Sequence, residues 1–289
     1  MGNILDGVKI AASIYADIKS RCGVLAKKGI VPGLATVLVG EDPASHVYVG
    51  QKIKQCGENG LSSIHKPLPA TATEADVIRV VHELNRDPKV HGIIVQLPLP
   101  KGIDPEKVII ELDPAKDADG LHPFNQGMLV RLKSWKDICA SGIPLPCTPA
   151  GIIQMLLFEN IPVEGMTAVV VGRSTLVGKP VAQLLSSLNA TVTMAHSYTK
   201  DLMKVCQSAD ILVAALGKPG FINKDGVKKG AVVIDVGITR SQNGLKGDVD
   251  FEHVKDLASW ITPVPGGVGR MTVAMLLKNT VVAAEKMAS

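Results

Sequence analysis

The sequence predicts an α/β protein of two domains, an N-terminal parallel α/β domain and a Rossmann-like domain, with a cleft between them. The first observation is length, since 289 residues are enough for two domains. The second is an alternation of short apolar segments with amphipathic ones, which is typical of parallel sheets covered by helices. The third is residues 168–188, AVVVGRSTLVGKPVAQLLSSL, whose pattern is strand, glycine turn and helix.

We place the first domain at residues 1–147 and the second at residues 148–270. A helix expected over residues 150–159 connects them. The final helix, within residues 271–289, follows the strands of the second domain, and we expect it to return to the first domain.

In the first domain, apolar residues at helical spacing predict a helix over residues 8–28. Asp42 and Pro43 predict the N-cap and first residue of a second helix, and a third is predicted over residues 73–85. Apolar runs predict strands at residues 34–39, 62–65 and 92–96.

The second domain continues the alternation. Its strands are predicted at residues 168–171, 191–195, 211–215, 232–236 and 260–261. A glycine-rich loop then leads into a helix predicted over residues 271–286. Residues 129–145 show no clear periodicity, and we expect them to be irregular.

Composition excludes several classes of partner. Apolar residues make up 46% of the chain and charged residues 20%, which fits a soluble protein with a large core. Aromatic residues are only 3%, too few for surfaces that stack single-stranded nucleic acid, and a net charge of +4 is too small to indicate DNA or a membrane. No apolar run reaches the length of a membrane span, and the N-terminus lacks a signal-peptide pattern.

The five cysteines favour a reducing compartment. Their number is odd, no two form C-x-x-C, and no histidine lies at zinc-ligand spacing from them. We therefore expect neither disulfides nor a metal, and a cytoplasmic location.

The glycine turn at residues 172–178 is a candidate dinucleotide site. Glycine lets the backbone approach a pyrophosphate, and the N-terminus of the following helix offers free N–H groups. The match to G-x-G-x-x-G is imperfect, because Ser174 stands at the second position and Gly178 comes one residue late. An ordinary strand-to-helix turn is the alternative.

The end of the next strand favours NADP over NAD. An NAD site usually has a carboxylate there to bind the ribose 2′-OH. Residues 196–200 instead read HSYTK, and Arg173 lies in the first turn. A cationic pocket rich in hydroxyls suits a 2′-phosphate; the alternative is a set of solvated loop residues.

Polar residues gather where the strands of the first domain end. Tyr48 and Lys52 are four residues apart on the helix after the first strand, Gln96 ends the third strand, and Asp119 lies in a turn. Each also has a purely structural interpretation: a solvated helix face, a backbone hydrogen bond, and a turn.

Six runs resemble the bifunctional methylenetetrahydrofolate dehydrogenase/methenyltetrahydrofolate cyclohydrolase family, in family order. They are YVGQK (48–52), QLPLP (96–100), KDADG (116–120), PCTP (146–149), GRS with VGKP (172–180) and TPVPGGVG (262–269). The resemblance implies two reactions. NADP takes a hydride from 5,10-methylenetetrahydrofolate, and water then opens the methenyl product to 10-formyltetrahydrofolate.

The resemblance also implies roles for single residues. Lys52 is the general acid/base of the hydrolysis, Gln96 tunes it, and Tyr48 orients the folate by stacking on it. The remaining implied contacts are Asp119, Pro265, Gly266 and Gly267 to the folate, and Gly172, Arg173, Ser174, Ser197 and Ile238 to NADP. Tetrahydrofolate derivatives, with or without a polyglutamate tail, are the implied partners, and a homodimer is the implied assembly.

One position departs from the family, which has Pro where this chain has Arg270. Loss of a proline costs about 0.4–1 kcal/mol, and a cation at a helix N-terminus is mildly unfavourable. We expect Arg270 to be tolerated at this small cost; the alternative is contact with an anion such as the glutamate tail.

Two other functions stay open at this stage. One is a different two-domain Rossmann dehydrogenase, which need not carry Tyr48, Lys52, Gln96 and Asp119 together. The other is a non-catalytic regulator that binds NADP, which predicts binding without turnover.

Overall fold

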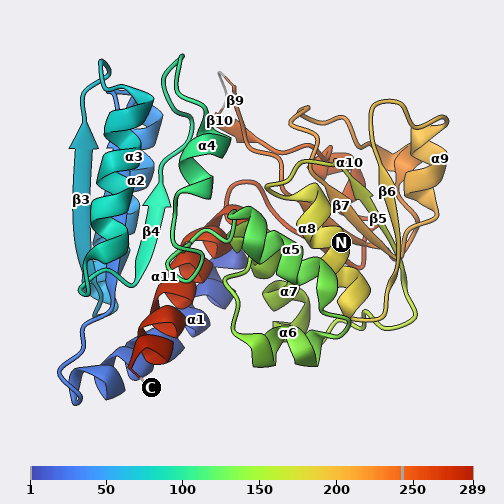
Figure 1. The fold of residues 1–289 in the computed structure, drawn as a ribbon. Helices are drawn as coiled ribbons and strands as arrows, with labels where there is room; N and C mark the ends of the chain where they lie inside the picture. The colour runs from blue at the N-terminus through green and yellow to red at the C-terminus, as the bar shows by residue number, and fades with distance from the viewer. Residues whose placement is uncertain (1, 242–243, 289) are drawn as a thin grey trace. The chain divides into compact units, whose positions relative to one another are not determined.

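The computed structural model describes residues 2–241 and 244–288 (Figure 1). The chain divides into two compact units. Unit 1 comprises Met1–Ala12, Leu129–Ser141 and Pro146–Thr272, and unit 2 comprises Ser13–Met128, Gly142–Leu145 and Val273–Ser289. Contacts group residues 1–12 and 129–141, which are predicted to belong to the first domain, with unit 1. The functional boundaries at residues 147 and 270 stay a prediction.

Unit 2 is built on a three-stranded parallel sheet in the order β3-β2-β4. The strands are β2 (Gly33–Val39), β3 (Ser62–Leu68) and β4 (Gly92–Val95), and the helices that follow them are α2 (Pro43–Glu58), α3 (Glu74–Arg86) and α4 (Pro105–Ile110). Every residue of the central strand β2 is buried, as expected for a strand covered on both faces. The edge strand β3 runs three residues beyond its predicted end, through Pro67, which an edge strand tolerates.

The helices of unit 2 begin where their capping residues predict. Asp42 caps α2 by accepting the N–H of Ser45 at 2.8 Å, with Pro43 as the first helical residue. Thr73 and Asp76 form a capping box at the start of α3. The four apolar residues predicted to face inward from α3 are all buried: Val77, Val80, Val81 and Leu84.

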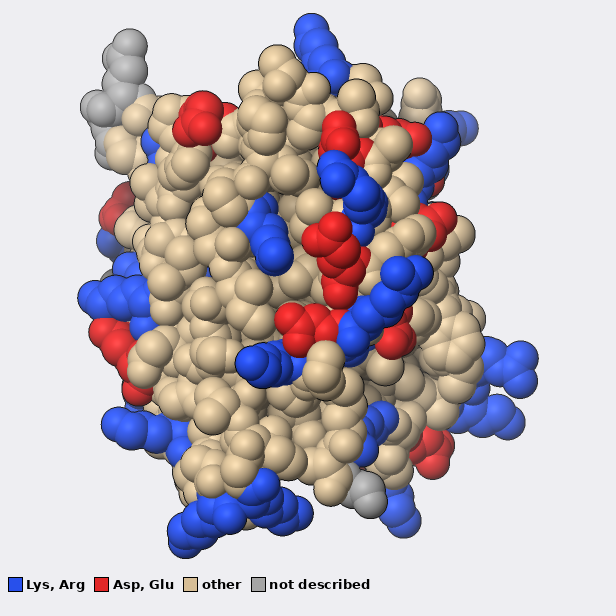
Figure 2. Space-filling model, turned by 60° about the vertical axis from the view of Figure 1, so that its left-hand side comes forward, with Lys and Arg blue, Asp and Glu red and all other residues tan. Residues whose placement is uncertain are grey.

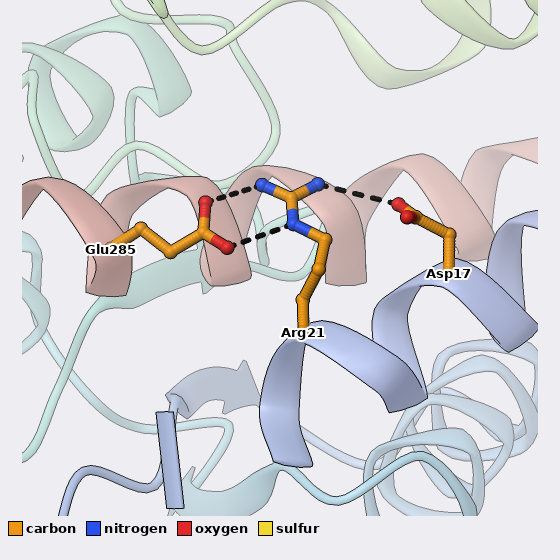
Figure 3. Close-up of polar contacts among 3 residues, drawn as sticks. All are labelled: Asp17, Arg21 and Glu285. Atoms are coloured by element: carbon orange, nitrogen blue, oxygen red, sulfur yellow. Dashed lines mark hydrogen bonds and ion pairs between the residues drawn. The ribbon is translucent and has the colours of Figure 1, made fainter. Parts of the chain in front are cut away.

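An ion-pair cluster joins the two longest helices within unit 2. They are α1 (Gly7–Ala26) and α11 (Val268–Met287). Figure 3 shows Arg21 of α1 held by Glu285 of α11, with Nε donating to Oε1 at 2.8 Å and Nη2 to Oε2 at 2.5 Å. Asp17 lies 3.4 Å from Nη1. The bidentate bond to Glu285 raises the pKa of Arg21, so the guanidinium stays charged and keeps α11 on α1.

Unit 1 contains a six-stranded parallel sheet in the order β1-β11-β8-β7-β5-β6. Its strands are β1 (Asn3–Ile4), β5 (Thr167–Val171), β6 (Thr191–Ala195), β7 (Ile211–Ala214), β8 (Val232–Asp235) and β11 (Trp260–Ile261). Its helices include α7 (Cys147–Phe158), α8 (Gly178–Ser187), α9 (Leu202–Gln207), α10 (Phe251–Val254) and the 3-10 turn η1 (Lys224–Gly226). Two short antiparallel strands, β9 (Thr239–Ser241) and β10 (Gly244–Lys246), pair beside it. Parallel sheets with connecting helices in both units agree with the predicted α/β class.

Two predictions about elements were wrong. Residues 129–145 are not irregular, because α5 (Pro123–Arg131) and α6 (Trp135–Ser141) cover most of them. A local signal existed: Ser134 Oγ accepts the N–H of Asp137 at 3.2 Å and donates to its carboxylate at 2.6 Å. The last helix begins at Val268, three residues before its predicted start, because the chain is already helical at Gly269 and Arg270.

The surface carries both charges in a mixed arrangement. On the face drawn in Figure 2, Lys and Arg side chains are interspersed with Asp and Glu. Across the described residues, no helix combines the length and apolarity needed to cross a membrane.

Candidate active site

Lys52 and Gln96 form a hydrogen-bonded pair in unit 2. Lys52 lies on α2, and Gln96 directly follows β4. Lys52 Nζ donates to Gln96 Oε1 at 2.8 Å, and only 8% of the Lys52 side chain is exposed. The amine is therefore largely removed from bulk water, and one of its hydrogen bonds goes to a neutral amide.

Backbone contacts orient the amide of Gln96. Its Nε2 donates to the carbonyl of Leu97 at 2.6 Å, and its backbone N–H donates to the carbonyl of Val37 on β2 at 2.9 Å. Because the amide nitrogen is used by Leu97, the amide oxygen is the atom that meets Lys52. Tyr48 lies one helical turn before Lys52 on α2 and is 42% exposed.

A buried carboxylate shapes the loop that carries Asp119. Asp117 is 1% exposed and accepts four hydrogen bonds. The donors are the N–H groups of Gly120, Leu121 and His122 and the Nδ2 of Asn125, at 2.8–3.2 Å. Asp117 is thus a turn-forming residue, whereas the half-buried Asp119 is the more accessible of the two carboxylates.

The sheet brings this loop to the same edge as Gln96. Asp117 forms a parallel bridge with Ile93 of β4, and Ile93 exchanges hydrogen bonds with Lys116 and Ala118. Gln96 and Asp119 each come directly after these paired segments, so both lie at the carboxyl edge of the unit 2 sheet. The structure therefore joins Lys52 to Gln96 directly and places Asp119 at the same sheet edge as Gln96.

Sequence reasoning missed Asn279, which fixes this loop from α11. Asn279 Nδ2 donates to the carbonyl of Ala118 and to that of Leu145, each at 2.9 Å. The available signal was an asparagine next to the apolar residues of the helix, since such a residue needs a partner when it packs inward.

The glycine turn of unit 1 is as tight as its sequence predicts. A Cβ on Gly172 would overlap the carbonyl oxygen of Ala215, and a Cβ on Gly178 would overlap that of Gly172. Ser174 Oγ accepts the N–H groups of Val177 and Gly178 at 3.2 and 3.3 Å, so this side chain closes the turn at the start of α8.

Arg173 and Tyr198 form a second polar cluster beside this turn. The guanidinium carbon of Arg173 lies 5.8 Å from the centre of the Tyr198 ring, which is 81% exposed. His196 meets the same ring edge-on at 6.2 Å. Ser197, between them in sequence, is exposed. No carboxylate follows β6 within residues 196–200, so the cluster presents a cation and hydroxyls.

Two further loops of unit 1 carry predicted contacts. Ile238 follows β8 and is 46% exposed, and its Cδ1 lies 3.1 Å from where a Cβ on Gly269 would stand.

In the loop before α11, Gly267 packs against Pro263 so closely that a Cβ would overlap the loop backbone. Pro265 and Gly266 lie in the same loop, and the Val264–Pro265 bond is cis. Arg270 is exposed in the first turn of α11, and its N–H donates to the carbonyl of Gly267 at 3.1 Å.

Both halves of the chain match models of one family. Residues 5–119 match the tetrahydrofolate dehydrogenase/cyclohydrolase catalytic domain, and residues 146–288 match the tetrahydrofolate dehydrogenase/cyclohydrolase NAD(P)-binding domain. The chain is 52% identical over 281 residues to Bifunctional protein FolD of Caldicellulosiruptor saccharolyticus, covering 95% of this chain and 97% of that one. It is 53% identical over 285 residues to Bifunctional protein FolD of Moorella thermoacetica, covering 98% and 99%.

Solved structures show the same similarity. The bifunctional enzyme FolD-methylenetetrahydrofolate dehydrogenase/cyclohydrolase from Campylobacter jejuni superposes with a TM-score of 0.93, at 42% identity over 99% of both chains. The N5,N10-methylenetetrahydrofolate dehydrogenase-cyclohydrolase of Trypanosoma brucei, solved with NADP cofactor and an inhibitor, has a TM-score of 0.91 at 37% identity over 99% of this chain and 98% of that one.

Proposed function

The chain belongs to the tetrahydrofolate dehydrogenase/cyclohydrolase family, and on that premise we propose how its residues divide the two activities. Membership confirms the resemblance and the two-domain α/β fold predicted from the sequence. The protein is a bifunctional enzyme that oxidises 5,10-methylenetetrahydrofolate with NADP and hydrolyses the methenyl product to 10-formyltetrahydrofolate.

Lys52 is the general acid/base of the hydrolysis. The observation that carries this role is its bond to Gln96 at 2.8 Å in a position that is only 8% exposed. A free lysine has a pKa of about 10.4, so an amine that takes a proton from water near neutral pH must lie where the ammonium is poorly solvated. The burial of Lys52 and its bond to the neutral amide of Gln96 support this role. The cationic methenyl substrate disfavours the ammonium further.

Asp119 and Tyr48 bind the folate. Asp119 presents a carboxylate on a loop held by Asp117 and Asn279. A carboxylate accepts two N–H bonds from the amino-bearing edge of a pterin. Tyr48, half exposed one turn from Lys52, offers a ring for stacking. Pro265, Gly266 and Gly267 are assigned to the same substrate.

The glycine turn and the Arg173 cluster hold NADP. Gly172 and Gly178 leave room where any Cβ would overlap backbone, which suits a pyrophosphate. Ser174 closes that turn. Arg173 and Ser197 supply a cation and a hydroxyl for the 2′-phosphate, with no carboxylate to repel it, and Ile238 supplies a backbone contact. When bound, NADP provides the nicotinamide ring that accepts the hydride.

A homodimer in the cytoplasm is the proposed state. The free side of β6, at the end of the unit 1 sheet, supports an assembly of two chains, since Met194 on it is 37% exposed. No disulfide joins any of the five cysteines, all of which lie among the described residues, and this supports a reducing compartment. The small net charge of +4 supports small anionic folates, including polyglutamylated ones, over nucleic acid or membrane as partners. Sedimentation equilibrium tests the dimer: a mass of one chain contradicts it.

The deciding experiment is turnover by the purified protein. It is given 5,10-methylenetetrahydrofolate with NADP or NAD, and both the methenyl and 10-formyl products are followed. Reduction of NADP with formation of 10-formyl product is the expected result. Accumulation of methenyl product contradicts the role of Lys52. Binding of NADP without turnover favours the non-catalytic regulator, and turnover with another substrate favours a different dehydrogenase.

A further inference from the structure

Two buried aspartates of unit 1 have no role in the function proposed above. Asp235 is the last residue of β8 and is 4% exposed, and Asp248 follows β10 and is fully buried. Burying a carboxylate is costly unless hydrogen bonds compensate it. The hydrogen-bond partners of Asp235 and Asp248 therefore indicate the role of these two residues.

Asp248 holds the loop that follows β7. Its Oδ2 accepts the N–H of Leu216 at 2.6 Å and that of Gly217 at 2.9 Å. Its Oδ1 is buried and has no hydrogen-bond partner among the described residues. A single oxygen thus makes the contact to the loop.

Asp235 holds the loop that follows β8 and the segment that carries Asp248. Its Oδ1 accepts the N–H of Gly237 at 2.9 Å and that of Asp248 at 2.8 Å, and its Oδ2 accepts the N–H of Val249 at 2.9 Å. Burial, with the nearby charge of Asp248, raises the pKa of Asp235 to about 6. The three N–H bonds oppose that rise and keep the carboxylate in place.

Two glycines allow the acids to interlock. A Cβ on Gly237 would overlap Asp248 Oδ1, and a Cβ on Gly247 would overlap Asp235 Oδ2. The Asp248 carboxylate therefore packs against Gly237, in the loop after Asp235, and the Asp235 carboxylate packs against Gly247, next to Asp248. These two contacts fix the distance between the two segments.

These loops lie at the sheet edge that carries the cofactor turn. β5, β7 and β8 are adjacent parallel strands, so the loops after them lie side by side. Ala215, just before Leu216, is the residue whose carbonyl Gly172 approaches. Nucleotides bind outside the carboxyl ends of such strands.

We infer that Asp248, supported by Asp235, is a positioning residue for NADP, because Asp248 fixes the backbone of residues 216 and 217 at the cofactor edge while Asp235 fixes that of Gly237. The inference rests on the proposed function, since it requires NADP at this edge. It assigns Asp248 no contact with substrate or cofactor.

The test compares three variants of the full-length protein. Asp248→Ala removes the acceptor of two N–H groups, and Asp248→Asn keeps one carbonyl oxygen for them. Asp250→Ala is the matched control, because Asp250 lies two residues on and pairs with His253 on the surface at 2.8 Å. Each is assayed for the KM of NADP, for the dehydrogenase kcat, and for hydrolysis of 5,10-methenyltetrahydrofolate supplied directly.

We expect Asp248→Ala to raise the KM of NADP about tenfold or more, and Asp248→Asn to stay within about threefold of wild type. Hydrolysis stays at its wild-type rate in both, because Lys52 and Gln96 belong to unit 2. Asp250→Ala changes neither activity. A purely structural role lowers both activities together, and that result overturns the inference, as does an unchanged KM in Asp248→Ala.

A further variant, Gly237→Ala, tests the inference if Asp248→Ala does not fold. Gly237→Ala adds a Cβ that displaces Asp248 Oδ1, and Gly237 has no left-handed backbone conformation that alanine would strain. The same rise in KM with hydrolysis intact is expected, and an unchanged KM overturns the inference. Wild-type protein that neither reduces NADP nor hydrolyses the methenyl substrate contradicts the proposed function instead.

Discussion

Lys52 Nζ donates a hydrogen bond of 2.8 Å to Gln96 Oε1, which joins the second helix of the chain to the end of strand β4. The acceptor is a neutral amide whose nitrogen is itself fixed by the carbonyl of Leu97. An amide orients an amine without holding its proton as a carboxylate does. This hydrogen bond distinguishes Lys52 from Lys54, the exposed lysine of the same helix.

Lys52→Met is expected to lower the hydrolysis of 5,10-methenyltetrahydrofolate by about 10²- to 10⁴-fold, because it removes the group that moves the proton. NADP reduction persists, since hydride transfer needs the rings to be aligned and no proton transfer by Lys52. Stopped-flow or steady-state assays of the two steps measure this. Lys54→Met is the control, because Lys54 is exposed and pairs with Glu58 at 3.7 Å. Near-normal hydrolysis by Lys52→Met contradicts the assignment.

Gln96→Glu places a carboxylate against the Lys52 amine. A close opposite charge favours the ammonium and raises the pKa of an amine, typically by about 1–3 units. The acidic limb of the hydrolysis pH profile is therefore expected to move to higher pH, with a lower rate at pH 7. A profile that drops in height without moving along the pH axis argues against tuning by Gln96.

Asn279→Ala leaves the carbonyls of Ala118 and Leu145 without their shared donor. A hydrogen bond contributes about 0.5–1.5 kcal/mol, so losing both is expected to lower the free energy of unfolding by roughly 1–3 kcal/mol. The KM for the folate rises as well, because Ala118 directly precedes Asp119. Urea titration and folate kinetics measure the two effects; a loss of stability with an unchanged folate KM contradicts a role in placing Asp119.

Arg173→Gln removes the cation expected at the 2′-phosphate of NADP. A hydrogen bond to a charged group contributes about 1.5–3 kcal/mol, so the KM of NADP is expected to rise roughly ten- to a hundredfold. The KM of NAD, which lacks this phosphate, stays unchanged. Lys204→Gln, an exposed cation on α9, is the control. Parallel changes for NADP and NAD show that Arg173 does not discriminate between them.

The raised pKa of Asp235 predicts a dependence of stability on pH. Its value moves from 3.8 to about 6 on folding, so between these pH values the folded state binds more protons than the unfolded state. The contribution of this group to stability therefore falls as pH rises from 4 to 6, by about 3 kcal/mol in total, and is constant above that range. Asp235→Asn cannot titrate. Urea unfolding between pH 4 and 7 is expected to show wild type losing this amount relative to Asp235→Asn; a constant difference contradicts it.

Local features were readable in the sequence because they depend on neighbours along the chain. Asp42 with Pro43 marked the start of α2, the apolar face of α3 was assigned correctly, and the turn at Gly172 was recognised from its glycines. Residues 129–145 were wrongly expected to be irregular, because the cap formed by Ser134 and Asp137 was not recognised. The six family runs then fixed the activities, since they recur in order over most of the chain.

The sequence by itself determined the α/β class, the family, the reactions and the residues Lys52, Gln96 and Asp119 as candidates. Only the tertiary structure decided which polar groups satisfy one another, because buried donors and acceptors must pair wherever the fold brings them. Lys52 meets Gln96 across 44 residues, and Asn279 holds Ala118 across 161. The same requirement joins Asp248 to the loop after β7, 32 residues away in the sequence. Patterns of neighbouring residues do not predict pairs separated this far along the chain.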